Sequence, residues 1–179
     1  MPVNPETQTA LDGVVASLGT SKFELADHTV KIVDIIASPA NYTLLDARSQ
    51  EERDVSIIAG SISKAEFLED PEKHKSSTVV CYCTVGYISG ACTKELRNAG
   101  HTNVNNMGDG AILGYTLNKT SNGEKTPLVK LDGTPTNEVH TFMPDLAGLA
   151  GEGMVGKSFA DPPAVLEAAN AAIKEKLGL

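Results

Sequence analysis

Short apolar runs and amphipathic stretches alternate along the first two thirds of the chain. Near its start, apolar side chains recur at the three- and four-residue spacing of one helix face. They are Leu11, Val14, Val15 and Leu18, and Gly19 follows as a residue that ends helices. We therefore expect an N-terminal amphipathic helix that ends before residue 20.

A second amphipathic stretch predicts a helix over Asp27–Ala37. Its first residue is a suitable N-cap, and a serine-proline pair after its end is unfavourable for further helix. Val30, Val33 and Ile36 are expected to face inward.

Apolar, β-branched runs between turn residues predict the strands, and the strongest such run is Ser77–Cys83. Strands are expected over residues 42–46, 77–83 and 102–107, helices over 64–70, 89–100 and 110–117, and a tight loop over 56–62. Strands that alternate with helices predict an α/β fold with a central, mainly parallel sheet flanked by helices on both faces. Ligands bind such sheets at the carboxyl ends of strands, where Cys83 is expected to lie.

The chain changes character near residue 121, where turns and glycines become frequent and an alanine-rich helix is predicted after the proline pair at 162 and 163. The apolar face of that helix, Leu166, Ala169, Ile173 and Leu177, must pack against either the main domain or a second copy of the chain. We therefore divide the chain into an N-terminal helix (1–20), a domain (21–120) and a C-terminal extension that ends in an amphipathic helix (121–179).

Composition and charge restrict the classes of partner. The formal net charge is −8 and lysine and arginine form no cluster, so we expect neither a nucleic acid nor a membrane as partner. No apolar run reaches the roughly 20 residues of a membrane span, and the first residues do not read as a secretory signal. Three cysteines do not make a disulfide framework. They fit a reducing compartment, either the cytoplasm or an organelle interior after loss of a transit peptide.

The sequence VVCYCTVGYISG places Cys83 before a glycine-containing loop that leads into a helix. The sulfur nucleophile is a thiolate, and converging N–H groups at a helix N-terminus favour such an anion. Gly86 allows the backbone to curl without steric strain. We predict Cys83 as the catalytic nucleophile; the alternative is a small buried residue. The residues expected to bind the substrate and surround the sulfur with amides are Thr84, Val85, Gly86, Tyr87, Ile88 and Ser89.

Several spaced elements together resemble a rhodanese-like domain. They are the sequences LLDARSQEE, IIAGSI, VVCYCTVGYISG and LRNAGHTNV, in this order within residues 21–117. The positions that match the family pattern are Asp46, Arg48, Glu52, Gly60, Cys83 and Gly86. The resemblance implies the rhodanese-like fold and a sulfurtransferase, whose cysteine takes a sulfane sulfur from a donor as a persulfide and passes it to a thiol acceptor.

The resemblance also implies roles and partners. Asp46 and Arg48 would support the loop by an ion pair, with substrate binding as the alternative. The donor would be a small sulfur compound or a persulfide-carrying protein. No cofactor is implied, and no metal is expected, because the CYC sequence lacks a second Cys/His pair at metal-site spacing. A six-residue loop, 83–88, suits sulfur transfer, whereas phosphatase relatives use a longer loop closed by arginine.

The loop departs from the family pattern at its last position. Ile88 stands where the family commonly has arginine or another polar residue, and arginine would bind an oxyanion such as thiosulfate through two N–H groups. Ile57 and Ala59 also replace the usual histidine and proline of the preceding turn. Two hypotheses follow. One is a persulfide-forming sulfurtransferase with reduced thiosulfate activity, and the other is a catalytically weak rhodanese-like module for binding or regulation.

Three further signals have competing interpretations. Cys81 is expected to be structural, and Cys92 either packs in the core or resolves a persulfide. Gly151–Ser158 has the spacing of a phosphate loop, but no strand pattern precedes it and prolines follow it. A glycine-rich loop is therefore expected, with nucleotide binding through Lys157 as the third functional hypothesis.

Overall fold

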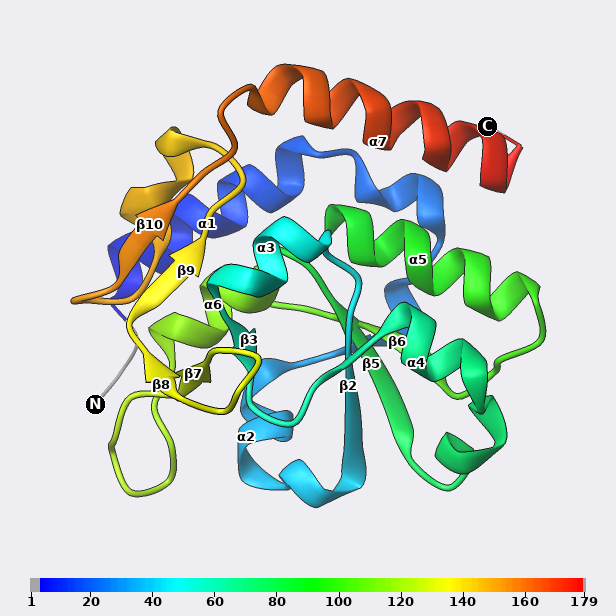
Figure 1. Ribbon diagram of the computed structural model, residues 1–179, viewed down its shortest axis with the longest axis horizontal. Helices are drawn as coiled ribbons and strands as arrows, with labels where there is room; N and C mark the ends of the chain where they lie inside the picture. Colours follow the sequence, from blue (N-terminus) through cyan, green and yellow to red (C-terminus); the bar gives the residue numbers. More distant parts are fainter. Residues whose placement is uncertain (1–3, 179) are drawn as a thin grey trace.

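A five-stranded parallel sheet forms the centre of the protein (Figure 1). The computed structural model describes residues 4–178. The strand order is β1-β6-β5-β2-β4, and each neighbouring pair runs parallel. The strands are β1 (Thr29–Val30), β2 (Tyr42–Asp46), β4 (Ile62–Ser63), β5 (Thr78–Tyr82) and β6 (Val104–Met107). The predicted mainly parallel sheet is thus confirmed.

Helices cover both faces of the sheet because the central strand β5 is apolar on both sides. Val80 and Tyr82 belong to one buried cluster, and Val79 and Cys81 belong to another. The helices are α1 (Pro5–Ser17), α2 (Ile32–Ala37), α3 (Gln50–Val55), α4 (Lys64–Glu69), α5 (Tyr87–Asn98), α6 (Ala111–Leu117) and α7 (Pro162–Leu177). Short 3₁₀ turns cover Thr20–Phe23, Ala26–His28, Pro39–Asn41, Pro71–His74 and Pro144–Leu149. Within residues 4–178, no helix has the length and apolar composition that crossing a bilayer requires.

The helix predicted over Asp27–Ala37 begins only at Ile32, so the prediction for its first half is wrong. Val30 belongs instead to β1, which pairs with β6. The Asp109 carboxylate accepts a hydrogen bond from the Ile32 amide at 3.0 Å and fixes the start of α2. Long-range pairing therefore overrides the local helical pattern. Val33, expected to face inward, is 56% exposed, whereas Ile32 is fully buried.

The expected tight loop over residues 56–62 contains two short strands, β3 (Ile57–Ile58) and β4. β3 pairs antiparallel with β7 (Leu128–Val129), which in turn pairs with β8 (Pro135–Thr136). The C-terminal extension is therefore joined to the domain by a second, three-stranded sheet. The sequence pattern did not predict the strands of this second sheet, because each of them contains only two residues.

The glycine-rich segment Gly151–Ser158 contains β10 (Val155–Lys157), which pairs parallel with β9 (Glu138–His140). A phosphate loop needs a strand before it and a helix directly after it. Here the strand lies inside the motif and the next helix starts only at Pro162. The Lys157 ammonium group lies 3.0 Å from a Glu138 carboxylate oxygen. The segment therefore lacks the geometry that the nucleotide hypothesis requires.

α7 runs along one side of the molecule and packs against α5 (Figure 1). Ile173 packs in a buried cluster with Phe23 and Ala91. The Tyr87 hydroxyl donates a hydrogen bond to the Asn170 side chain at 2.9 Å. The main domain thus covers the apolar face of α7. A homodimer stays a prediction, as do the domain boundaries at residues 20 and 120.

Replacing Gly151 by alanine should destabilise the protein. A Cβ at this position would lie against the backbone carbonyl oxygen of Thr116, whose hydroxyl accepts a hydrogen bond from the Gly151 amide at 2.9 Å. Overpacking of this kind lowers the free energy of unfolding by roughly 1–3 kcal/mol, which urea denaturation measures. Gly148→Ala is the control, since no atom lies within 4 Å of a Cβ there. Equal stability of the two variants would contradict the packing of the extension on α6.

Candidate functional site

Cys83 lies directly after β5, at the carboxyl end of the central strand. The residue is 3% exposed, and the Gly86 amide donates a hydrogen bond to its Sγ at 3.2 Å. Gly86 has a φ of +102°, a left-handed backbone that favours glycine, and α5 begins at the next residue. Glycine thus lets the chain turn so that an amide at the start of α5 reaches the sulfur.

The cysteine loop is held from α6 as well as from α5. The carbonyl oxygens of Cys83 and Thr84 accept hydrogen bonds from the amides of Ile112 and Leu113, at 3.1 and 3.2 Å. Of the six amides expected around the sulfur, Gly86 is the one whose hydrogen bond to Sγ is found within residues 4–178. The loop therefore places one amide on the sulfur, with the N-terminal dipole of α5 behind it.

Asp46 and Arg48, predicted to support the loop, form a buried ion pair at the end of β2. Arg48 donates from Nε and Nη2 to the two Asp46 oxygens at 2.9 and 2.7 Å, and from Nη2 to the Ser56 carbonyl oxygen at 2.6 Å. The Tyr82 hydroxyl donates to Asp46 at 2.8 Å. Burial opposes the guanidinium charge, but Asp46 outweighs burial and raises the pKa of Arg48. Arg48 Nη1 has no hydrogen-bond partner among the residues that the structure describes.

Glu52 connects α3 to the cysteine loop. Its Oε1 accepts a hydrogen bond from the Thr84 hydroxyl at 3.1 Å, and its Oε2 takes part in the capping box of α3. His140 lies 3.9 Å from the same carboxylate, but its Nδ1 accepts a hydrogen bond from the Phe142 amide and so carries no proton. Burial, followed by the charge of Arg48, lowers the pKa of His140. The buried imidazole is therefore neutral at pH 7, and its proximity to Glu52 is not an ion pair.

Two cavities meet at Cys83. The larger one, called the apolar chamber below, has a volume of about 290 Å³. Its lining includes Val14, Leu18, Cys83, Ile88, Leu146 and Leu166. The smaller one, called the polar cavity, has a volume of about 150 Å³ and is lined in part by Arg48, Glu52 and Cys83. Although Cys83 is almost inaccessible to water, it therefore borders space for a small ligand on two sides.

Segments far from the cysteine loop supply much of the chamber wall. α1 contributes Val14 and Leu18, the 3₁₀ turn Pro144–Leu149 contributes Leu146, and α7 contributes Leu166. Phe142 lines both cavities and has a left-handed backbone with a φ of 67°. The sequence pattern identified the apolar faces of α1 and α7. It did not identify Cys83 as their meeting point, because that contact joins segments more than 60 residues apart.

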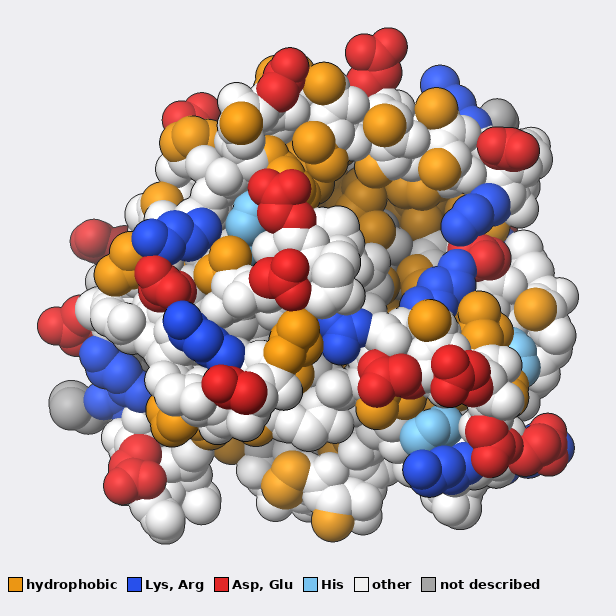
Figure 2. Space-filling model, viewed as in Figure 1, with side chains coloured by type: hydrophobic (Ala, Val, Ile, Leu, Met, Phe, Trp, Pro, Cys, Tyr) orange, Lys and Arg blue, Asp and Glu red, His pale blue; other side chains and the backbone are white. Residues whose placement is uncertain are grey.

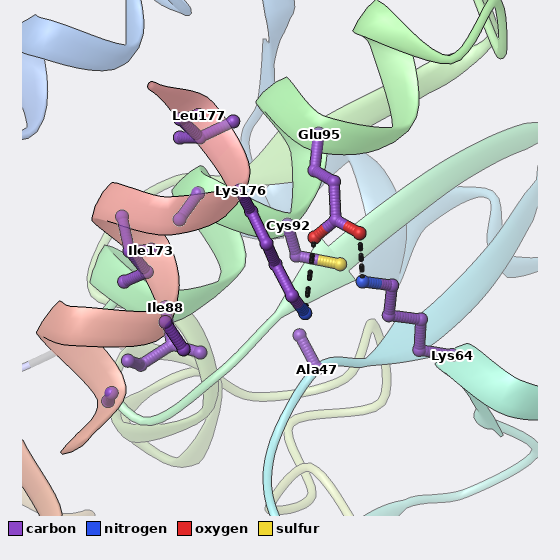
Figure 3. Close-up of a pocket in the computed structure, with 11 residues that line it drawn as sticks. Ala47, Lys64, Ile88, Cys92, Glu95, Ile173, Lys176 and Leu177 are labelled. Carbon is purple, nitrogen blue, oxygen red and sulfur yellow. Dashed lines mark hydrogen bonds and ion pairs between the residues drawn. The ribbon is translucent and has the colours of Figure 1, made fainter. Parts of the chain in front are cut away.

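A third cavity, of about 190 Å³, lies beneath α7 next to Cys92 (Figure 3). Figure 2 shows hydrophobic side chains lining a hollow below α7. Glu95 pairs there with Lys64 at 2.7 Å and with Lys176 at 3.7 Å (Figure 3). A hydrogen bond with Cys81 is the main cause that lowers the pKa of Cys92, whereas burial raises the pKa of Cys81.

Cys81 and Cys92 pack in the same buried cluster with Leu45, Phe67 and Val104. This placement agrees with the structural role expected for Cys81 and with core packing, the first of the two alternatives for Cys92. Within residues 4–178, no group of three His, Cys, Asp or Glu side chains is arranged to hold a metal ion.

Asp46→Asn should destabilise the protein strongly, because it leaves the Arg48 charge buried without its counterion. Removing one partner of a buried ion pair lowers the free energy of unfolding by about 3–5 kcal/mol, measured by chemical denaturation. Asp54→Asn is the matched control on α3, where the exposed carboxylate accepts a hydrogen bond from the Gln50 side chain. Its effect should stay within about 0.5 kcal/mol. Similar losses in both variants would contradict the importance of the buried pair.

Residues 29–111 match the family model described as Rhodanese-like domain. No curated protein sequence matches the chain. Similar solved structures include a rhodanese-related protein from Thermoplasma volcanium, with 24% identity over 57% of this chain and 97% of that chain, at a TM-score of 0.45. They also include a thiosulfate sulfurtransferase from Pseudomonas aeruginosa, with 18% identity over 91% of this chain and 27% of that chain, at a TM-score of 0.48.

The family match covers β1 through the start of α6, and so includes the complete central sheet, the Asp46–Arg48 pair and the cysteine loop. The segments that complete the chamber wall, α1, the 3₁₀ turn at Pro144–Leu149 and α7, lie outside it. Residues 29–111 are therefore similar to a rhodanese-like domain, and α1 and the segments after α6 flank the matched region.

Proposed function

We propose that the protein is a sulfurtransferase in which Cys83 carries sulfane sulfur as a persulfide. The observation that supports this most directly is the placement of Cys83. Its sulfur accepts a hydrogen bond from the Gly86 amide at the start of a twelve-residue helix, and the residue borders two cavities. An N–H group and a helix N-terminus both stabilise a thiolate, which is the reactive form of cysteine.

The proposed reaction has two steps. The Cys83 thiolate attacks the outer sulfur of a donor R–S–SH, the bond between the two donor sulfurs breaks, and the donor leaves as R–S⁻ while Cys83 becomes the persulfide. An acceptor thiolate then attacks the outer sulfur of that persulfide and releases the Cys83 thiolate. Each step forms one S–S bond and breaks one, so no external oxidant or reductant is needed. Gly86 donates to the Cys83 sulfur both before and after transfer.

Ile88 bears on which donors the site accepts. Its side chain lines the apolar chamber, the polar cavity and the third cavity, and it offers no charge to an oxyanion. Lys94, the nearest cation along the sequence, is paired with Glu24 at 2.8 Å. Without a cation in the loop, a doubly charged donor such as thiosulfate would be desolvated with little compensation. We therefore favour a neutral or protein-bound sulfur donor.

The second candidate function is a binding or regulatory module with little turnover. The observation that favours it is the low exposure of Cys83 beneath α7, together with the uncharged Ile88. The two candidates differ in one measurable property, the reaction of Cys83 with sulfane donors. The cytoplasmic or organellar location and the homodimer remain proposals.

Cys83→Ser should abolish sulfur uptake. After incubation with inorganic polysulfide or an organic hydropersulfide, intact-mass spectrometry should show one added sulfur atom on the parent protein and none on the variant. Cys92→Ser is the control and should take up sulfur as the parent does, because Cys92 belongs to the core cluster and not to the lining of either Cys83 cavity. If no donor adds sulfur to the parent, and Cys83 alkylates slowly, the binding module becomes the better explanation.

Ile88→Arg should raise kcat/KM for thiosulfate. A new charge-assisted hydrogen bond to the donor contributes roughly 1.5–3 kcal/mol, which corresponds to a gain of about ten- to a hundredfold. Ile88→Met is the control, since it keeps an apolar side chain of similar size and should leave thiosulfate turnover low. Circular dichroism checks that both variants fold. A folded arginine variant without any gain would show that the missing cation does not limit the reaction.

A further inference from the structure

We propose that the apolar chamber beside Cys83 binds the sulfur acceptor, and that this acceptor is a small apolar thiol. The inference rests on the proposed sulfur transfer and adds the chemical class of one substrate. It is based on the composition of the chamber wall, on its volume, and on the place of Cys83 in that wall.

Among residues 4–178, no charged side chain lines the chamber. Its polar lining residues are Ser17, Thr84 and Tyr87. The Thr84 hydroxyl already donates to Glu52, and the Tyr87 hydroxyl already donates to Asn170. An acceptor with carboxylate or ammonium groups would lose its hydration there without gaining a partner. A neutral, apolar compound instead gains free energy by removing its own surface and that of the wall from water.

The volume of the chamber, about 290 Å³, lies at the lower end of the range for small-molecule sites. It admits a compact group such as a single aromatic ring with a short side chain. Since Cys83 forms part of the wall, a thiol on that group can reach the outer sulfur of a persulfide while its apolar body contacts Leu146 and Leu166. This geometry favours a small organic thiol over a peptide.

The walls of the two cavities at Cys83 differ in their charged residues. The polar cavity is lined by Arg48 and Glu52, and Arg48 Nη1 has no hydrogen-bond partner among residues 4–178. The Arg48 side chain is fully buried and paired with Asp46, whereas the chamber wall has no charged side chain among residues 4–178. Ile88 and Phe142 belong to the walls of both spaces and lie with Cys83 where they meet. The chamber is therefore the larger of the two spaces at Cys83 and the one without a charged residue in its wall, which suits an apolar compound.

The transfer balances as Cys83–S–SH plus R–SH giving Cys83–SH plus R–S–SH. The acceptor thiolate attacks the outer sulfur, the S–S bond to Cys83 breaks, and the acceptor proton ends on the Cys83 sulfur. No step changes the total oxidation level of the sulfur atoms. The apolar acceptor leaves as a hydropersulfide.

Acceptor selectivity tests the inference. Persulfidated protein, freed of donor, is mixed with benzyl mercaptan or with 2-mercaptoethanol, and the loss of the Cys83 persulfide is followed by intact mass. Benzyl mercaptan should react at least about tenfold faster, because its ring is buried in the chamber. Leu166→Gln should reduce this ratio severalfold, whereas Ala168→Gln, on an exposed position of the same helix, should preserve it. A parent ratio near one, or equal ratios in both variants, would overturn the inference.

A second measurement does not depend on persulfide formation. Benzyl methyl sulfide, which has no thiol, should slow the alkylation of Cys83 by iodoacetamide in the unmodified protein. Protection without any sulfur uptake would refute the sulfurtransferase and leave an apolar binding site. Sulfur uptake without protection or selectivity would support the sulfurtransferase and refute the apolar acceptor.

Discussion

The buried ion pair between Asp46 and Arg48 fixes the strand ends from which the cysteine loop begins. Asp46 ends β2, and its carboxylate accepts a hydrogen bond from Tyr82, which ends β5. Arg48 also donates a hydrogen bond to the Ser56 carbonyl oxygen, next to β3. Two charges removed from water are tolerated only because nearly all of their hydrogen-bonding groups are used. The carboxyl ends of two neighbouring strands are thereby locked together one residue before Cys83.

The rhodanese-like domain and the flanking segments contribute different parts of the site. Residues within 29–111 provide Cys83, the proposed nucleophile, together with its amide partner and the buried ion pair. α1, the 3₁₀ turn at Pro144–Leu149 and α7 provide a hydrophobic cover over the same cysteine. Phe142, at the junction, has a left-handed backbone, and its ring packs edge-on against Phe159 at 5.0 Å. A residue with this backbone conformation persists only where its surroundings hold it, and the contact with Phe159 is part of what holds Phe142.

The sequence was informative where local pattern and final structure agree. The apolar run before Cys83 became β5, and the glycine after it became the start of α5, because both features depend on neighbouring residues alone. The region around Val30 was predicted incorrectly, since its strand exists only through pairing with β6. The positions of Asp46 and Arg48 followed from the family resemblance rather than from periodicity. The apolar chamber was not predictable, because its walls come from three segments that meet only after folding.

Ile88 connects the uncharged end of the cysteine loop with the apolar cover above it. From the sequence alone, an isoleucine at the end of an anion-binding loop indicates weaker binding of anions. In the folded protein its side chain is half-buried and borders three cavities, and the residues opposite it on α7 include Ala169. An arginine at this place would need a counterion or water, yet Glu95, the carboxylate of the third cavity, is already shared by Lys64 and Lys176. The uncharged isoleucine is thus matched to the apolar cover. A loop without a cation agrees with the proposal that the substrates carry little charge, because the Gly86 N–H group and the α5 dipole are then left to stabilise a single anion, the sulfur of Cys83.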